Sequence, residues 1–231
     1  MSLRLLTGCI CLVALAFFSG CSREPEHVAD VATGRPAVAP APAARPERPR
    51  IVVLGDSLTA GLGLSPDEAY PAILQQRLDG AGLAYEVVNA GVSGDTSAGG
   101  LRRLEWSLTG DVRVLVVALG GNDGLRGLPV TELRNNLEGI VKEARARKIR
   151  VVLAGMEAPP NFGKAYTDDF RNVYASLSKQ YNVALVPFLL NGVAGIEAMN
   201  QADGIHPTAE GAKIAADNVW AVLRPMLKSS E

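Results

Sequence analysis

Cysteine is confined to the start of this chain, where all three residues of this type lie: Cys9, Cys11 and Cys21. The rest of the sequence therefore has no disulfide, no thiol nucleophile and no cysteine metal ligand. Histidine is also scarce, since only His27 and His206 are present. Beyond the N-terminal region, a metal ion could therefore bind to one histidine and otherwise only to oxygen ligands, which argues against a metal-dependent hydrolase. We expect no metal and no cofactor.

An excess of charge of one sign is also missing. Lysine plus arginine total 23 against 24 for aspartate plus glutamate, so the chain lacks the basic surplus of a nucleic-acid-binding protein and we expect no nucleic-acid partner. The apolar run at residues 5–18 is too short to span a bilayer comfortably. With 231 residues the chain is long enough for one domain with a sizeable core, and we expect a monomer.

The N-terminal apolar run has the features of a targeting segment. Arg4 supplies the positive flank, and the run ends at "FSGC", residues 18–21. Small residues before a cysteine resemble the lipobox of bacterial lipoproteins. The resemblance implies a signal peptide over residues 1–20, acylation of Cys21 and, because Ser22 follows, anchoring in the outer membrane facing the periplasm. The alternative is an ordinary secretory signal and a free periplasmic protein.

Residues 21–49 are predicted to be a tether rather than part of a domain. They include "RPAVAPAPAARPERPR", in which alternating proline and alanine favour extended backbone and cannot form a packed core. The folded domain is therefore predicted over residues 50–231.

Within that domain, strand-like and helix-like segments alternate. Apolar runs predict five strands, at residues 50–55, 85–90, 112–120, 150–156 and 182–187. Helical periodicity or helix-capping residues predict four helices, at residues 69–82 (ending at Gly80 or Gly82), 130–148, 167–181 (with Thr167 as N-cap) and 208–226. Several strands are apolar on both faces, as in sheets covered by helices on either side. The sequence predicts an α/β fold, a three-layer sandwich around a five-stranded parallel sheet.

Ser57 follows the first predicted strand in "IVVLGDSLTAG". Serine is a favoured helix N-cap, so Ser57 is either the cap of the next helix or a nucleophile. The motif differs from the G-x-S-x-G turn of α/β-hydrolases, because Thr59 stands where that pattern has glycine. Ser57 alone does not decide between the two.

The loop "ADGIHPTAEG" contains the one histidine of the predicted domain, His206, three residues after Asp203. This spacing lets the carboxylate reach Nδ1–H of the imidazole, which leaves Nε2 free to accept a proton. The alternative is a structural histidine in a capping loop, with Asp203 as the cap of the last helix.

Two glycine-rich loops follow the second and third predicted strands. In "NAGVSGDTSAGG", Gly94 has no side chain and can bring its N–H close to a substrate. In "LGGNDGLRG", Asn122 offers a side-chain amide donor. Both are the kind of donor that stabilises an oxyanion, although such loops are also common turns.

Taken together, four stretches, "GDSL", "VVNAGVSGDTS", "LGGNDGLRG" and "DGIHP", resemble the four blocks of the SGNH or GDSL hydrolases in order and spacing. The likeness covers residues 51 to about 224 and is greatest to the bacterial thioesterase I, lysophospholipase and arylesterase branch. It implies a flavodoxin-like α/β/α fold and hydrolysis of acyl esters and thioesters, including lysophospholipids, through an acyl-enzyme.

The resemblance also implies a role for each matching residue. Ser57 would be the nucleophile, His206 the general base and then acid, and Asp203 the residue that orients the imidazole. The oxyanion hole would consist of the Ser57 and Gly94 N–H groups and the Asn122 amide. Asp56 would support the turn and form hydrogen bonds to neighbouring loops rather than take part in the chemistry.

Two other functions stay open at this point. The first is a carbohydrate or peptidoglycan O-acetylesterase, a chemistry also found among SGNH hydrolases. The second is a non-catalytic envelope lipoprotein that uses the cleft for binding. The "GNDGLRG" and "APPNFGKAY" loops favour the acyl esterase, since they resemble acyl-pocket loops of the thioesterase branch.

Overall fold

The computed structural model describes residues 48–227. The predicted signal peptide, Cys21 and most of the tether lie outside this range, so the domain boundaries predicted for them stay predictions. Within residues 48–227, no helix is long and apolar enough to cross a membrane.

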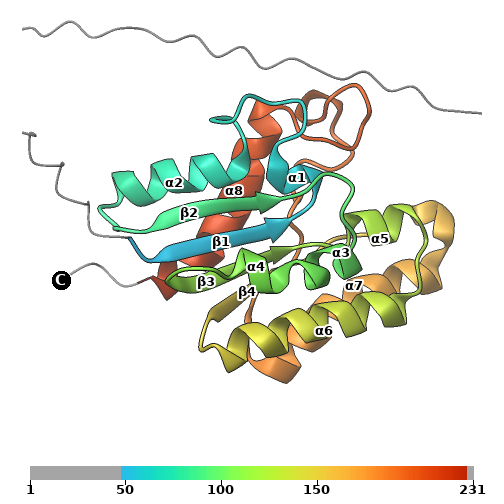
Figure 1. Ribbon diagram of the computed structural model, residues 1–231. Helices are drawn as coiled ribbons and strands as arrows, with labels where there is room; N and C mark the ends of the chain where they lie inside the picture. The colour runs from blue at the N-terminus through green and yellow to red at the C-terminus, as the bar shows by residue number, and fades with distance from the viewer. Residues whose placement is uncertain (1–47, 228–231) are drawn as a thin grey trace, which may run out of the picture. The chain divides into compact units, whose positions relative to one another are not determined.

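Five parallel strands form one sheet in the order β2-β1-β3-β4-β5, as Figure 1 shows for the first four. Their bounds are β1 (Arg50–Gly55), β2 (Glu86–Gly91), β3 (Val112–Ala118), β4 (Arg150–Ala154) and β5 (Ala184–Val186). All five predicted strands are thus confirmed. The chain passes from β1 to β2 on one side and then returns to place β3 on the other side of β1. Ligand sites in such sheets lie beyond the carboxyl ends of the strands where this reversal occurs.

Helices cover both faces of the sheet, which gives the predicted three layers (Figure 1). Helices α2 and α8 pack together on one face, while α3, α6 and α7 form the other layer. The helix bounds are α1 (Ser57–Ala60), α2 (Tyr70–Gly80), α3 (Ser97–Arg102), α4 (Leu104–Ser107), α5 (Gly121–Leu125), α6 (Val130–Ala146), α7 (Lys164–Tyr181) and α8 (Ala209–Leu223), with short 3-10 turns at Pro160–Phe162, Glu197–Met199 and Arg224–Met226.

The core lies between the central strands and these two helix layers. In β3, Val114 to Val117 are fully buried, because helices cover both sides of this strand. On α6, the predicted stripe of Leu133, Leu137, Ile140, Val141 and Ala144 is buried, as its 3.6-residue spacing requires. Strand β2 lies at the edge of the sheet and stays partly exposed.

Helix α7 begins earlier than predicted. Its first residue is Lys164, so Thr167 is not the N-cap, and the Thr167 hydroxyl instead donates to the Lys164 carbonyl. The extra turn is stabilised by packing: Tyr166 contacts the aromatic rings of Phe162 and Phe170 and donates its hydroxyl to the Leu128 carbonyl. Tertiary packing therefore overrides the local capping preference.

Candidate active site

Ser57 lies where β1 meets α1, and it is not the helix cap. Asp56 holds the cap position and accepts a hydrogen bond from the Leu58 N–H at 3.0 Å, which leaves the Ser57 hydroxyl free for another partner. The turn is tight, because a Cβ on Gly55 would lie 1.9 Å from the Thr59 Oγ1. The turn requires glycine there, and the interpretation of Ser57 as a cap is wrong.

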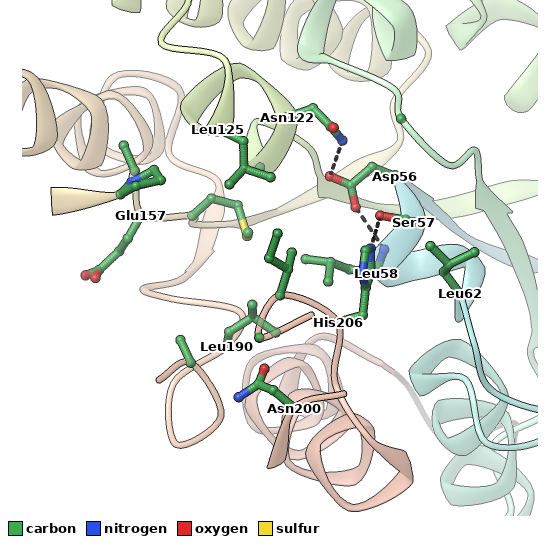
Figure 2. Close-up of a pocket in the computed structure, with 18 of the residues that line it drawn as sticks. Asp56, Ser57, Leu58, Leu62, Asn122, Leu125, Glu157, Leu190, Asn200 and His206 are labelled. Carbon is green, nitrogen blue, oxygen red and sulfur yellow. Dashed lines mark hydrogen bonds between the residues drawn. The ribbon is translucent and has the colours of Figure 1, made fainter. Parts of the chain in front are cut away.

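The partner of the Ser57 hydroxyl is His206, which lies 149 residues further along the chain. Oγ of Ser57 is 2.9 Å from Nε2 of His206, and Nδ1 of His206 is 2.6 Å from Oδ2 of Asp203. Figure 2 shows the hydroxyl directed at the imidazole. Serine, histidine and aspartate therefore form one continuous hydrogen-bonded row, the arrangement that activates a serine nucleophile.

Asp203 serves the histidine loop rather than the last helix. The N-cap of α8 is Thr208, so the interpretation of Asp203 as that cap is wrong. Its Oδ1 accepts from the N–H groups of His206 and Ile205, at 3.0 and 2.9 Å. These hydrogen bonds hold the pKa of the Asp203 carboxyl well below its usual range, and the one from the His206 backbone N–H contributes most. The carboxylate therefore stays charged beside the imidazole.

Two of the three predicted oxyanion donors come from loops on either side of Ser57. Gly94 follows β2 and has a φ of +83°, in the left-handed region that glycine adopts without strain. Asn122 lies in α5, just after β3, and its Nδ2 donates to the Asp95 carbonyl at 2.9 Å and to Asp56 Oδ2 at 3.3 Å. The structure thus brings both to the Ser57 pocket, with the amide of Asn122 engaged by neighbouring protein oxygens.

Asp56 is a buried carboxyl next to the nucleophile candidate. The residue is 2% exposed, and this burial raises the pKa of the Asp56 carboxyl to about 6 although the Leu58 N–H and the Asn122 amide donate to it. The prediction that Asp56 supports the turn and bonds to a neighbouring loop is confirmed by these two contacts.

A cavity of about 570 Å³ opens beside Ser57 and His206. Both loops that the sequence favoured as acyl-pocket loops line it, through Gly121, Asn122 and Leu125 and through Ala158, Pro159 and Pro160. Figure 2 shows Leu125, Leu190 and Leu62 around Ser57 and His206. The remaining lining residues are Asp56, Leu58, Ser93, Gly94, Met156, Glu157, Phe188, Ala194, Asn200, Gly204 and Ile205. This wall is mainly apolar and suits a hydrocarbon chain.

The sequence did not predict the part of the wall that follows β5. Phe188, Leu190 and Ala194 come from a segment without regular structure, in which Leu189 and Val193 are fully buried anchors. The apolar run "VPFLLNGVAG" was the available signal. Among residues 48–227, no three His, Cys, Asp or Glu side chains converge as a metal site would require.

Comparison with known proteins identifies relatives of this site. The model of the GDSL-like lipase/acylhydrolase family matches residues 53–214. The chain is 47% identical to esterase TesA of Pseudomonas aeruginosa over 178 residues, which are 77% of this chain and 89% of that protein. It is 36% identical to thioesterase 1/protease 1/lysophospholipase L1 of Escherichia coli over 178 residues, 77% of this chain and 84% of that one.

Among solved structures, a crystal structure of TesA superimposes with a TM-score of 0.74 at 46% identity, covering 77% of this chain and 99% of that one. The family match spans more than half of the chain and includes all the predicted site residues of the domain: Ser57, Gly94, Asn122, Asp203 and His206. The chain therefore belongs to the GDSL-like lipase/acylhydrolase, or SGNH hydrolase, family, in the branch of TesA, thioesterase I and arylesterase.

Proposed function

We propose that this chain is a serine hydrolase that cleaves carboxylic acyl esters and thioesters through an acyl-enzyme, with Ser57 as nucleophile. Its place in the esterase and thioesterase class follows from its family and relatives. One observation carries the proposal for the residues: the row from Ser57 Oγ to His206 Nε2, at 2.9 Å, and from His206 Nδ1 to Asp203, at 2.6 Å. Ser57 and His206 also line the apolar cavity, where an acyl group could bind.

In the first half of the reaction, Ser57 Oγ attacks the carbonyl carbon while His206 Nε2 takes its proton. Asp203 keeps the proton on Nδ1 and stabilises the imidazolium that forms. The oxyanion accepts hydrogen bonds from the Gly94 N–H, the Asn122 amide and the Ser57 N–H, which lies in the first turn of α1 where helix N–H groups have no intrahelical partner. The long hydrogen bond from Asn122 to Asp56, 3.3 Å, is the one that the amide can exchange for the oxyanion.

In the second half, the tetrahedral intermediate collapses and the bond to the leaving alcohol or thiol breaks, with the proton returned by His206. Water then attacks the acyl-enzyme, His206 takes a proton from it, and a second collapse releases the carboxylic acid and restores the Ser57 hydroxyl. Every proton transfer uses the same imidazole, which is why its position between Ser57 and Asp203 is central to the proposal.

The wall of the cavity favours acyl groups longer than acetyl. Its leucine, methionine, proline and phenylalanine side chains offer apolar contacts that a two-carbon group cannot fill. The names of the relatives, esterase, thioesterase, lysophospholipase and arylesterase, support acyl esters and thioesters as substrates, and lysophospholipids among them. An acetylxylan esterase of Xylanibacter ruminicola is 27% identical to this chain. Because the chain covers only 45% of that protein, the match gives little support to an acetyl ester as substrate.

A chain-length series tests the proposal. We expect kcat/KM for octanoyl and palmitoyl esters to exceed that for the acetyl ester of the same leaving group. Ser57→Ala and His206→Ala should each remove nearly all turnover, and the double variant should be scarcely slower, because these residues act as a unit. Substantial turnover by His206→Ala would contradict the mechanism, and a preference for acetyl would support the O-acetylesterase.

We also propose that the protein is anchored in the cell envelope through acylated Cys21. The support is in the sequence: small residues precede this cysteine and a proline/alanine-rich segment separates it from the domain. Two or more acyl chains make anchoring stable. Cys21→Ser should therefore move the protein from the membrane fraction to the soluble fraction, and a Cys21→Ser protein that stays with the membrane would refute lipid anchoring.

A further inference from the structure

Arg126 connects the two loops that carry the proposed oxyanion donors. It is the C-cap residue of α5, one turn after Asn122, and its backbone N–H donates to the Asn122 carbonyl at 3.1 Å. Its Nη2 donates to the Gly94 carbonyl at 2.9 Å and lies 3.5 Å from Oδ1 of Asn122. One guanidinium therefore contacts the backbone of the first loop and the side chain of the second.

These contacts also fix which way the Asn122 amide faces. A guanidinium can only donate hydrogen bonds, so it favours the oxygen of the amide on its own side. Nδ2 is then directed at the other side, where the Asp95 carbonyl and the Asp56 carboxylate accept from it. Arg126 and these two acceptors thus favour the same orientation, which presents the donor end of Asn122 to the site.

The Gly94 loop has other attachments that do not involve Arg126. The Ser97 N–H and hydroxyl both donate to Asp123, at 2.8 and 2.5 Å, and Arg103 pairs with Asp95 at 2.6 Å. These contacts hold the loop after Gly94, whereas the Arg126 hydrogen bond acts on Gly94 itself. Removing Arg126 should therefore loosen Gly94 and the Oδ1 side of the Asn122 amide without detaching the loop.

We propose that Arg126 is a positioning residue that aligns the Gly94 N–H and the Asn122 amide on one oxyanion. The inference rests on the proposed function, because it assumes that these two groups are the oxyanion donors. The guanidinium acts through them and does not touch the reacting atoms. The alternative is an exposed arginine that only stabilises the end of α5.

Arg126→Met tests this inference. Misaligned donors weaken transition-state binding, so we expect kcat for an octanoyl ester to fall about tenfold or more, with KM and Tm near the wild-type values. The Ki of octylboronic acid, which forms a tetrahedral adduct on a catalytic serine, should rise by about the same factor as kcat/KM falls. Arg126→Lys keeps one donor and should recover part of the loss.

Arg113→Met is the matched control, since it removes an arginine at the amino end of β3, where Arg113 pairs with Asp111. It should keep wild-type kcat and Ki. A wild-type kcat in Arg126→Met, or a lower Tm with unchanged kcat, would overturn the inference while the Ser57 chemistry stands. An unchanged Ki beside a lower kcat would overturn it as well. Loss of activity on Ser57→Ala tests the proposed function separately.

Discussion

At the scale of single residues, Asp56 has two tasks beside the nucleophile candidate. It caps α1 through the Leu58 N–H, and it accepts from the amide of Asn122. Both tasks require an acceptor in a place that is almost fully buried, and burial raises the pKa of the carboxyl to about 6. The charged form therefore costs stability, and the site retains it at neutral pH.

This cost predicts a change of stability with pH. Because the pKa of Asp56 is about 6 in the folded state, against 3.8 as its ordinary value, its contribution to stability is full below about pH 4 and is lost as the pH rises through 6. As the pH rises from about 4 to about 8, the free energy of unfolding of Asp56→Asn should increase by about 3 kcal/mol relative to that of the wild type. Urea unfolding at each pH measures this, and a difference that stays constant contradicts the raised pKa.

Asn122 supplies the second prediction at this scale. Replacing it with alanine removes a donor used mainly in the transition state, so kcat should fall about a hundredfold or more while KM changes little. Steady-state kinetics on one ester separates the two parameters. If KM rises and kcat is unchanged, Asn122 binds substrate or supports the turn instead.

Single residues also mark where prediction from the sequence ends. Ser57, Gly94, Asn122, Asp203 and His206 could be predicted to share a site, because each lies in a motif at a strand end or before a helix. The contact from Arg126 to the Gly94 carbonyl could not, since it joins two loops 32 residues apart whose relative placement depends on the whole sheet. The apolar run after β5 is visible in the sequence, but its position beside Ser57 also depends on the whole sheet.

At the scale of elements, one arginine connects the carboxyl ends of two neighbouring strands, β1 and β2, through hydrogen bonds. Arg103, which follows α3, donates to the carbonyls of Gly55 at the end of β1 and Ala90 in β2, both at 2.8 Å. Its Nε pairs with Asp95 at 2.6 Å. Both side chains are mostly buried, 19% and 18% exposed, so this ion pair is poorly screened by solvent. Arg103 therefore connects α3 to β1, β2 and the Gly94 loop.

Arg103→Met should accordingly destabilise the fold. It leaves two strand-end carbonyls without this donor and the Asp95 carboxylate without its partner, which predicts a loss of about 2 to 4 kcal/mol in the free energy of unfolding. Denaturant unfolding measures the loss. Arg113→Met, at the exposed amino end of β3, should change stability by less than about 1 kcal/mol. Equal effects of the two substitutions would contradict the role of Arg103.

Strands and helices were predicted best where the hydrophobic pattern is strong. The apolar runs of β1 and β3 and the stripe on α6 gave correct elements, because burial on both faces of a strand or on one face of a helix selects such patterns. The start of α7 was predicted wrongly. Its first turn depends on contacts of Tyr166 with Phe162 and with the Leu128 carbonyl, which no local pattern reveals.

At the scale of the whole molecule, the described domain contains every group that the proposed reaction needs. Strand β1 enters the sheet at Arg50 and reaches the site at its other end, so the loops that carry Ser57 and His206 lie away from residues 48–50. A protein that begins at residue 48 should therefore keep the Tm and the kcat/KM of the full chain. An inactive but folded truncated protein would show that residues 1–47 contribute to the site.

The central claim is that Ser57 carries the acyl group. The most direct measurement is the mass of each peptide after reaction with an alkyl phosphonate ester, which transfers its phosphonyl group to an activated serine. The account predicts one phosphonyl group per molecule, on the peptide that contains Ser57, and almost none in Ser57→Ala or His206→Ala. A label on another residue, or equal labelling of Ser57→Ala, would contradict it.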